Sequence, residues 1–245
     1  SGMADDTMVV FTSDHGDLVG AHGGLMQKWH NAYDEAIRVP LVVRGPGVAA
    51  SPGGVHMPTS HIDLVPTLLG LAGIDVERAA ALVAVEHDEA QALPGRDLSP
   101  LITGAPGAES LAEPLYFMTE DEPGRGLSAL NIITGAAYEP VPFPSHVESV
   151  ITSLPTGTDG EAELWKLNHY YERLPAFDEA HGLPVNPFAP PPAEDVWEVH
   201  NLTTDPEERR NRATSAPDVV RDLNAVLDAQ REAKRRLPQL RNQPA

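Results

Sequence analysis

Two short, continuous runs of apolar residues near the start of the chain predict buried strands. Residues 8–12 (MVVFT) are rich in β-branched side chains and stop at the polar cluster of residues 13–17 (SDHGD). A run without polar alternation is typical of a strand that is buried on both faces of a parallel sheet. Residues 40–44 (PLVVR) form a second such run, which ends at the sequence Gly-Pro-Gly.

Helical spacing follows in two places. Ile62, Val65 and Leu68 share one face of a helix that we expect to begin at Ser60, with Asp63 placed to complete a capping box, and to end at Gly70 or Gly73. A last helix is expected from Ser215, with Pro217 in its first turn. Its apolar positions are Val219, Val220, Leu223, Val226 and Leu227.

The region between these helices alternates in the way that strands do. Residues 115–118, 129–133, 146–151 and 163–168 are four strand-like runs separated by turns with Pro and Gly, which favours an antiparallel sheet. Residues 195–202 are predicted to form a last strand with Trp197 and Val199 facing inward. The proline-rich residues 182–194 are expected to form an extended loop on the surface. We therefore predict two domains, 4–105 and 106–245, within an α/β fold.

The polar cluster after the first strand contains the candidate chemistry. Ligands in open α/β sheets bind just outside the carboxyl ends of strands, which is where Asp14 and His15 fall. A carboxylate and an imidazole are both ligands for a divalent cation. The alternative is structural, with Asp14 as a helix cap and His15 as a polar turn residue. His22 lies in the glycine-rich loop that follows, and Lys28 lies just beyond it.

The order of these residues resembles the sulfatase family of the alkaline-phosphatase superfamily. The pattern is S-D-H-G-D-x-x-G-x-H-G, then a lysine, an aromatic and acidic stretch, and R-V-P-L-V-V-R-G-P-G. The matching residues are Asp14, His15, Gly16, Gly20, His22, Gly23, Lys28, Tyr33, Arg38, Pro40, Arg44 and Gly47. Residues 198–208 also match the family's E-L-Y-D-L-x-x-D-P-x-E ending.

The resemblance implies a fold and a set of roles. The fold would be the C-terminal part of an alkaline-phosphatase-like mixed sheet with flanking helices, followed by a small antiparallel sheet and a C-terminal helix. Asp14 and His15 would be metal ligands, Lys28 would contact the sulfate oxygens, and His22 would be a donor or a loop-stabilising group. Asp34 and Glu35 read as solvated or capping residues, and Arg38 as a partner of Asp34.

The implied activity is metal-dependent hydrolysis of a small-molecule sulfate ester. Calcium is the expected metal, with manganese, zinc or iron as alternatives. The same residues fit phosphodiester or phosphonate monoester hydrolysis within the superfamily. A different class, a non-catalytic binding or assembly module derived from the fold, is also compatible with the sequence.

The expected nucleophile is missing. Sulfatases use a formylglycine made in a C/S-x-P/A-x-R motif, yet the chain has no cysteine, and the serine at 215 lacks the arginine that should follow four positions later. Two further metal-binding aspartates of an earlier strand are also missing. We expect the isolated chain to be inactive and to bind a cation weakly or not at all. The exposed edge of its sheet should be filled by a partner chain, or the chain should rearrange or self-associate through that edge.

Composition narrows the range of partners. The net charge is −19, from 36 acidic and 17 basic residues in a chain of 245, which argues against nucleic acid. No apolar run is long enough to span a membrane and no targeting segment is visible, so we expect a soluble protein. Disulfides are excluded by the lack of cysteine, and the compartment stays open.

Overall fold

The structure is a computed structural model in which two compact units can be described. The described residues are 2–28, 30–50, 54–87, 92–106, 108–120, 134–136, 144, 146–171, 177–178, 183–184 and 194–234. The first unit comprises Ser1–Asp14 and Val39–Leu115, and the second comprises His15–Arg38 and Tyr116–Ala245. We call His15–Arg38 the inserted segment. The predicted domains 4–105 and 106–245 have other bounds and stay a prediction.

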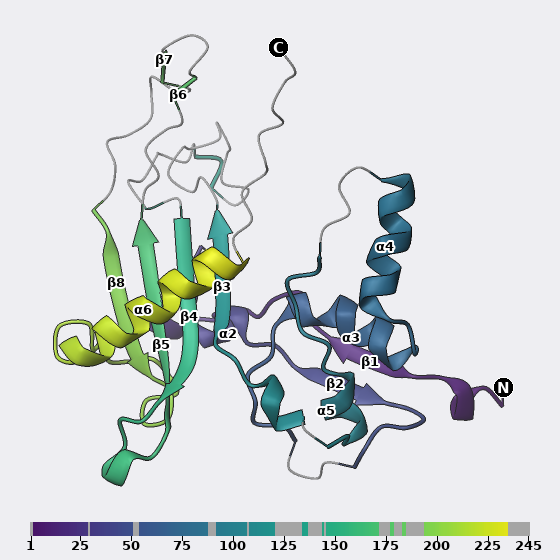
Figure 1. Ribbon diagram of the computed structural model, residues 1–245. Coiled ribbons are helices and arrows are strands. Elements are labelled where there is room, and N and C mark those ends of the chain that lie inside the picture. The colour runs from purple at the N-terminus through teal and green to yellow at the C-terminus, as the bar shows by residue number, and fades with distance from the viewer. Residues whose placement is uncertain are drawn as a thin grey trace. The chain divides into compact units, whose positions relative to one another are not determined.

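The first unit is built on a pair of antiparallel strands (Figure 1). Strand β1 (Val9–Thr12) pairs with β2 (Leu41–Arg44), with Val9 opposite Arg44 and Thr12 opposite Leu41. The prediction of a parallel strand buried on both faces was wrong, because Val9 and Phe11 are 56% and 61% exposed. The apolar run shows which side chains favour burial but not what covers them, and here only one face of the pair is covered.

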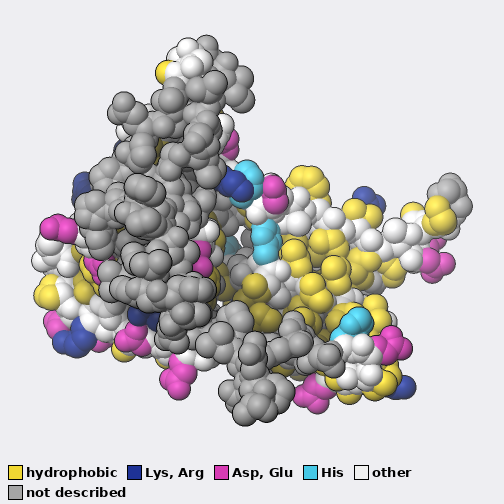
Figure 2. Space-filling view, turned by 90° about the horizontal axis from the view of Figure 1, so that it is seen from above, with side chains coloured by type: hydrophobic (Ala, Val, Ile, Leu, Met, Phe, Trp, Pro, Cys, Tyr) yellow, Lys and Arg dark blue, Asp and Glu magenta, His cyan; other side chains and the backbone are white. Residues whose placement is uncertain are grey.

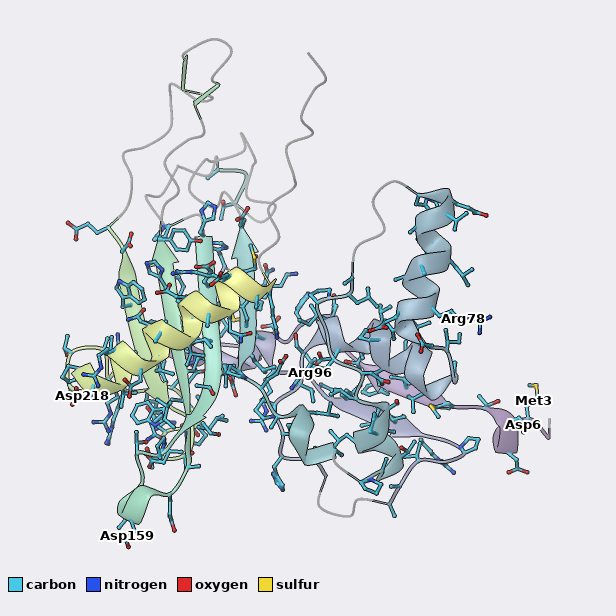
Figure 3. All side chains as sticks on the ribbon, in the orientation of Figure 1. Met3, Asp6, Arg78, Arg96, Asp159 and Asp218 are labelled. Carbon is cyan, nitrogen blue, oxygen red and sulfur yellow. The ribbon has the colours of Figure 1, made fainter. Side chains whose placement is uncertain are left out.

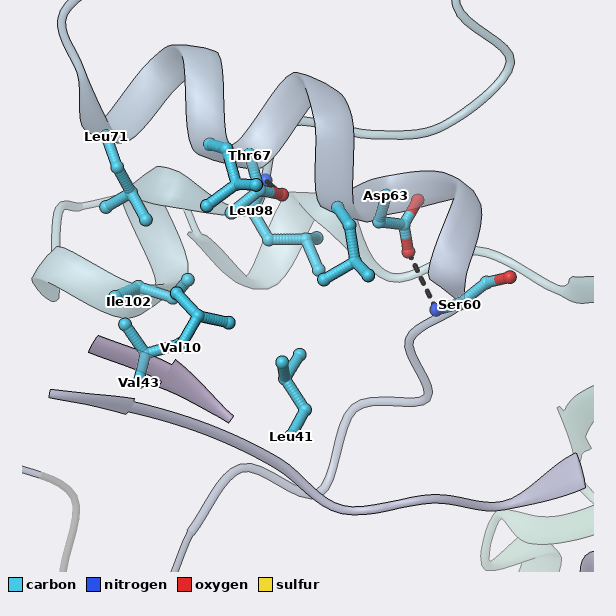
Figure 4. Close-up of a pocket in the computed structure, with 11 residues that line it drawn as sticks. Val10, Leu41, Val43, Ser60, Asp63, Thr67, Leu71, Leu98 and Ile102 are labelled. Atoms are coloured by element: carbon cyan, nitrogen blue, oxygen red, sulfur yellow. Dashed lines mark hydrogen bonds between the residues drawn. The ribbon is translucent and has the colours of Figure 1, made fainter. Parts of the chain in front are cut away.

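Helices cover that face. The first unit contains the 3-10 turns η1 (Ala4–Asp6), η2 (His61–Asp63) and η3 (Ala108–Leu111), and the helices α3 (Leu64–Leu71), α4 (Val76–Glu86) and α5 (Ser99–Thr103). Val10 and Val43 of the strands line a small apolar cavity together with Leu68 and Leu71 of α3 and with Ile102 (Figure 4). The expected capping box is confirmed, since the Ser60 amide donates to Asp63 Oδ2 at 2.9 Å.

A buried ion pair fastens the start of this helical region to the loop that follows α4. Arg96 (Figure 3) donates from Nη2 to Asp63 Oδ2 at 2.7 Å and from its backbone amide to Asp63 Oδ1 at 2.7 Å. Its Nη1 atom also donates to the Leu111 carbonyl at 2.9 Å. These hydrogen bonds outweigh the effect of burial and lower the pKa of Asp63.

The second unit contains a four-stranded sheet in the order β3-β4-β5-β8. Its strands are β3 (Leu115–Glu120), β4 (His146–Leu154), β5 (Glu163–Tyr171) and β8 (Val196–Asn201), and the 3-10 turn η5 (Thr158–Gly160) joins β4 to β5. The β4–β5 and β5–β8 pairs are antiparallel, as predicted. The two-residue strands β6 (Phe177–Asp178) and β7 (Leu183–Pro184) pair with each other. The strand predicted at 129–133 and most of the extended loop at 182–194 lie outside the described residues.

The predicted C-terminal helix is confirmed and crosses one face of this sheet (Figure 1). Helix α6 (Pro217–Lys234) buries Leu223 and Leu227 completely. The apolar core that forms there contains Tyr116, Val150, Trp165, Leu167, Val199, Leu223 and Leu227. Trp197 packs against this core, so the predicted inward direction of Trp197 and Val199 is correct.

The opposite face of the sheet is polar and is covered by the inserted segment. That segment contains α1 (Ala21–Gly24), a turn with left-handed residues, and the single-turn helix α2 (Asp34–Ile37). Ala32 packs against Val147 and Tyr170 in a second, smaller apolar cluster. Around this cluster, the side chains that the sheet directs toward the segment are Lys166, Asn168, Tyr170, Glu198 and His200, which we call the polar face.

Apolar side chains are also gathered on the surface of the first unit (Figure 2). Those more than one-third exposed include Val9, Phe11, Val42, Val65, Leu82 and Val85. No helix in the described part of the chain has the length and apolar character needed to cross a membrane.

Candidate active site

The inserted segment holds an unusual backbone. Val19, His22, Gln27 and His30 have positive φ angles of 44°, 47°, 63° and 21°, a region that non-glycine residues rarely adopt. Asp17 supports this path, because its Oδ1 atom accepts from the amides of Val19 at 2.8 Å and of Gln27 at 3.1 Å. Backbone strain of this kind is found mainly where function requires it.

A glycine fixes the entry to this segment. The Gly16 amide donates to the Ala36 carbonyl at 2.8 Å. A Cβ atom at position 16 would lie 1.9 Å from the Glu35 carbonyl oxygen, which no side chain can do. The first turn of the segment therefore lies directly against α2 only because residue 16 is glycine.

The two predicted metal ligands are neighbours at the point where the chain leaves β1. Asp14 is exposed, and its Oδ1 atom accepts from Ser13 Oγ at 3.3 Å. His15 is partly buried, with Nδ1 2.7 Å from the Gly16 carbonyl oxygen. A carbonyl oxygen only accepts, so Nδ1 carries the proton and Nε2 the lone pair that a metal would use.

These residues fit a cation only in part. A carboxylate oxygen and an imidazole nitrogen are suitable ligands, but hard divalent ions require six or more. Among the residues that the structure describes, no group of three or more His, Asp or Glu side chains is placed to hold a metal. Asp14 and His15 therefore account for two ligands and not for a complete site.

His22 and Lys28 lie on the inserted segment with His15, and they differ in how they are held. The His22 ring stacks on Tyr33 with 3.7 Å between ring centroids and 8° between planes, and its Nε2 atom lies 3.0 Å from Glu35 Oε2. Lys28 is exposed in a turn. His22 is thus held by an aromatic ring and a carboxylate of its own segment.

A network of contacts continues from His22 into the polar face through Tyr33. Its hydroxyl donates to Glu198 Oε1 at 2.8 Å, and Glu198 Oε2 accepts from Tyr170 at 3.0 Å and from Asn168 at 3.2 Å. Burial alone would raise the pKa of Glu198, but the polar groups around it lower this pKa to about 2. Burial and the Glu198 charge raise the pKa of both tyrosines, so the carboxylate is ionised and the hydroxyls keep their protons.

A second buried cluster ties α2 to the sheet. Lys166 is fully buried, with Nζ 2.5 Å from Asp34 Oδ1, 2.9 Å from Glu208 Oε1 and 3.0 Å from the Ala32 carbonyl. The Asp34 amide donates to Glu208 Oε2 at 2.6 Å. Burial raises the pKa of Glu208, although the Lys166 charge opposes the shift.

These contacts correct one interpretation and confirm another. Asp34 and Glu35 are not simply solvated or capping residues, because Asp34 pairs with Lys166 and Glu35 with His22. The sequence offered no sign of these pairs, since their partners are far away along the chain or on a strained loop. The expected Arg38–Asp34 pair is present at 3.7 Å.

Several residues of the network were not predicted as site residues. Glu198 and Glu208 belong to residues 198–208, which match the C-terminal pattern of the family, and Tyr33 is one of the residues that match its first pattern. The sequence indicated no role for any of the three. The available signal was the alternation in β8, where Glu198 and His200 face away from Val199. Alternation places them on a polar face but does not show that the inserted segment buries it.

The chain resembles known proteins in both fold and sequence. It has the fold of the alkaline-phosphatase-like sulfatases. A Bacteroides thetaiotaomicron structure, provisionally named a sulfatase, superposes with a TM-score of 0.60 at 23% identity. The match covers 96% of this chain and 38% of that one. The phosphonate monoester hydrolase of Agrobacterium radiobacter superposes with a TM-score of 0.53 at 22% identity. The match covers 94% of this chain and 36% of that one.

The sequence comparisons confirm the resemblance to the sulfatase family. Residues 1–74, which carry all four predicted site residues, match the family model Sulfatase. The choline-sulfatase of Rhizobium meliloti is 46% identical over 76 residues, which are 31% of this chain and 14% of that protein. Arylsulfatase K of Danio rerio is 26% identical over 227 residues, which are 93% of this chain and 32% of that protein. The chain thus spans about a third or less of these relatives.

Proposed function

We propose that this chain supplies part of the active site of a metal-dependent sulfuric ester hydrolase. The observation that carries the proposal is the match of residues 1–74 to the sulfatase model, because that segment contains Asp14, His15, His22 and Lys28. The strained, well-anchored backbone of the inserted segment supports the same assignment.

Each of these residues has a role that its chemistry allows. Asp14 and His15 would provide two ligands of a divalent cation, for which we propose calcium, with manganese, zinc or iron as alternatives. When bound, such a cation supplies charge that polarises the ester oxygens. Lys28 is a compact positive charge suited to an anionic sulfate ester. The Nε2 atom of His22 faces Glu35, so His22 would stabilise the loop or, as the imidazolium, donate from Nδ1 to the ester.

The isolated chain is proposed to be inactive. The sequence contains no cysteine and no serine followed by the P/A-x-R pattern, so it offers no formylglycine precursor. Two ligands are too few to hold a hard cation tightly. With p-nitrophenyl sulfate and added calcium or manganese, we expect no turnover above that of buffer.

A phosphonate monoester or phosphodiester is the alternative substrate class. The structural match to the Agrobacterium radiobacter enzyme is the reason to test this substrate class, although at 22% identity the match shows the fold alone. Aryl sulfate and aryl phosphonate should therefore be assayed side by side in a complete hydrolase that carries this segment. Binding of another macromolecule without hydrolysis of either ester would favour the non-catalytic module.

The metal assignment is tested in a complete hydrolase that carries this segment. The variant Asp14→Ala should abolish turnover of the aryl ester and raise the calcium concentration needed for any residual rate. Asp218→Asn, a change at an exposed aspartate of α6, is the matched control and should leave the rate unchanged. Wild-type turnover in Asp14→Ala would refute the assignment.

A further inference from the structure

The His22 ring is held by two neighbours of its own segment. Glu35 Oε2 lies 3.0 Å from His22 Nε2, and the Tyr33 ring lies parallel to the imidazole at 3.7 Å. A carboxylate only accepts hydrogen bonds, so in the neutral ring Nε2 carries the proton and Nδ1 the lone pair. Contact with Glu35 therefore selects one tautomer, and contact with Tyr33 selects one ring orientation.

Tyr33 is in turn held by the sheet. Its hydroxyl donates to Glu198 Oε1 at 2.8 Å, from a position 165 residues away along the chain. Glu198 is itself fixed by Tyr170 and Asn168 of β5. Tyr33 also forms a T-shaped pair with the buried His200 ring, with 6.3 Å between ring centroids and 66° between ring planes. The position of the Tyr33 ring is thus set by side chains of β5 and β8.

We propose that Glu35, Tyr33 and Glu198 are positioning residues of the candidate active site. Glu35 fixes the tautomer of His22, and Glu198 fixes its ring plane through Tyr33. The inference rests on the proposed function only in treating His22 as a site residue. His22 has a φ angle of 47°, a conformation that persists only where the surroundings enforce it, and these three residues provide that enforcement.

The arrangement explains why charged groups are buried on the polar face. A carboxylate taken out of water is costly unless hydrogen bonds replace the lost hydration. Glu198 receives three such bonds and stays ionised, which makes it a strong and directional acceptor for Tyr33. An apolar contact at the same place would hold the ring less specifically, because dispersion contacts have little directionality.

Nuclear magnetic resonance of the 245-residue chain tests the proposal without any substrate. The His22 signals are assigned by comparison with His22→Gln. We expect nitrogen shifts of a single Nε2–H tautomer, and ring protons shifted upfield by the stacked Tyr33. Glu35→Ala should give a mixture of tautomers, whereas Glu35→Gln, whose amide oxygen still accepts, should restore the single tautomer.

A second set of variants tests whether Glu198 of β8 orients the His22 ring through Tyr33. We call this chain of contacts the relay. Glu198→Ala should reduce the upfield shift of the His22 ring protons although Tyr33 is still present, and Tyr33→Leu should abolish it. Glu207→Ala removes an exposed glutamate and is the matched control, with no expected change. Tyr33→Phe retains the ring and loses only the hydroxyl, so it reports on the relay even where Glu198→Ala fails to fold.

Two results would overturn the proposal. One is a wild-type His22 with both tautomers equally populated. The other is a Glu198→Ala or Tyr33→Phe variant that melts at a lower temperature but keeps the full His22 ring shift, which would make the contact merely structural. The proposed function fails separately, through wild-type turnover of a complete hydrolase carrying Asp14→Ala, and that result leaves the positioning measurement intact. Full turnover with His22→Gln would remove only the role of His22 as a site residue.

Discussion

Lys166 attaches the inserted segment to the sheet through its ammonium group. Its ammonium group is completely buried, and its partners are two carboxylates and one backbone carbonyl. A buried cation of this kind is tolerated only because all three partners are oxygens within hydrogen-bond distance. The cluster therefore contributes specificity, since Lys166 pairs with Asp34 of α2 and Glu208 accepts from the Asp34 amide only when α2 lies at this place on the sheet.

Removing that charge should be costly. Lys166→Met leaves Asp34 and Glu208 as two neighbouring carboxylates without their cation, and we expect a loss of about 3–5 kcal/mol in the free energy of unfolding. Urea denaturation followed by circular dichroism measures it. Lys28→Met, at an exposed lysine of the inserted segment, is the control and should change stability by less than about 0.5 kcal/mol. Equal effects of the two variants would contradict the role of Lys166.

The close approach of Gly16 to α2 gives a second test at this scale. Gly16→Ala places a methyl group against the Glu35 carbonyl, so the segment must move, and we expect a loss of about 1–3 kcal/mol. Gly20→Asn is the control, because no atom lies within 4 Å of the added Cβ and asparagine tolerates a positive φ. Thermal unfolding of both variants distinguishes a steric clash from a general effect of losing a glycine.

At the scale of elements, a column of rings runs across the sheet on the side of α6. His146 of β4 stacks on Tyr171 of β5, and His169 stacks on both Tyr171 and Trp197 of β8. His146–Tyr171 and His169–Trp197 are opposite one another in the strand register. The column therefore fixes the register of three strands, because a slip by one residue would put every ring on the other face.

His169 makes this column sensitive to pH. Its Nε2 atom lies 2.8 Å from Asp195 Oδ2, and its Nδ1 atom lies 3.1 Å from Arg231 Nη2, whose guanidinium also contacts Glu148. Burial, aided by the Arg231 charge and opposed by Asp195, lowers the pKa of His169 below its usual 6.5. The unfolded chain thus binds this proton more readily, so the histidine contributes stability above about pH 6.5 that is lost as the pH falls.

We expect the free energy of unfolding to fall between about pH 7 and pH 5 more steeply in the wild type than in His169→Phe. Phenylalanine retains the stacking surface and does not titrate. Urea titrations at several pH values measure the two slopes. His56→Gln, at an exposed histidine, should keep the wild-type slope. Parallel pH profiles for the wild type and His169→Phe would show that His169 does not titrate differently on folding.

These elements show how far the sequence could predict the fold. Helix α6 and strands β4, β5 and β8 followed from local spacing, because each has an apolar face of regular period. The helical region from Ser60 to Leu71 was also predicted, but its predicted apolar face is partly exposed, since Ile62, Val65 and Leu68 are 37%, 54% and 46% exposed. The antiparallel pairing of β1 and its exposed face did not follow, since an apolar run does not identify its neighbours. The site residues near β1 came from a motif. The contacts of His22 came only from the structure, because a loop with positive φ angles brings Tyr33 and Glu35 to the ring, and because Tyr33 meets Glu198 across 165 positions.

At the scale of the whole molecule, two surface properties oppose each other. The chain carries a net charge of −19, which repels other copies. The first unit exposes apolar residues of a two-stranded sheet, including Val9, Phe11 and Val42, which favour association. A sheet of two strands is only marginally stable in water unless its apolar surface is covered. Association through these apolar residues should therefore outweigh the repulsion between copies once salt screens the net charge.

Self-association should therefore increase with salt. We expect sedimentation velocity to show a rising share of dimers and larger species between about 0.02 M and 0.5 M NaCl, as the Debye length shrinks. Phe11→Lys should suppress this share without a loss of thermal stability, because the side chain is already exposed. Arg44→Lys, in the partner strand, keeps both charge and polarity and is the control. A salt-independent monomer would contradict the expectation.

The route of the chain through the two units also determines when each could be completed during synthesis. The inserted segment emerges early, but Lys166, Glu198 and Glu208 emerge 132 to 174 positions after their partners. At roughly 5–20 residues per second, this segment would wait on the order of ten to thirty seconds for them. On the ribosome, its glycines and strained loop would be exposed until the last strand was synthesised. During this time the segment would need protection from proteolysis and aggregation.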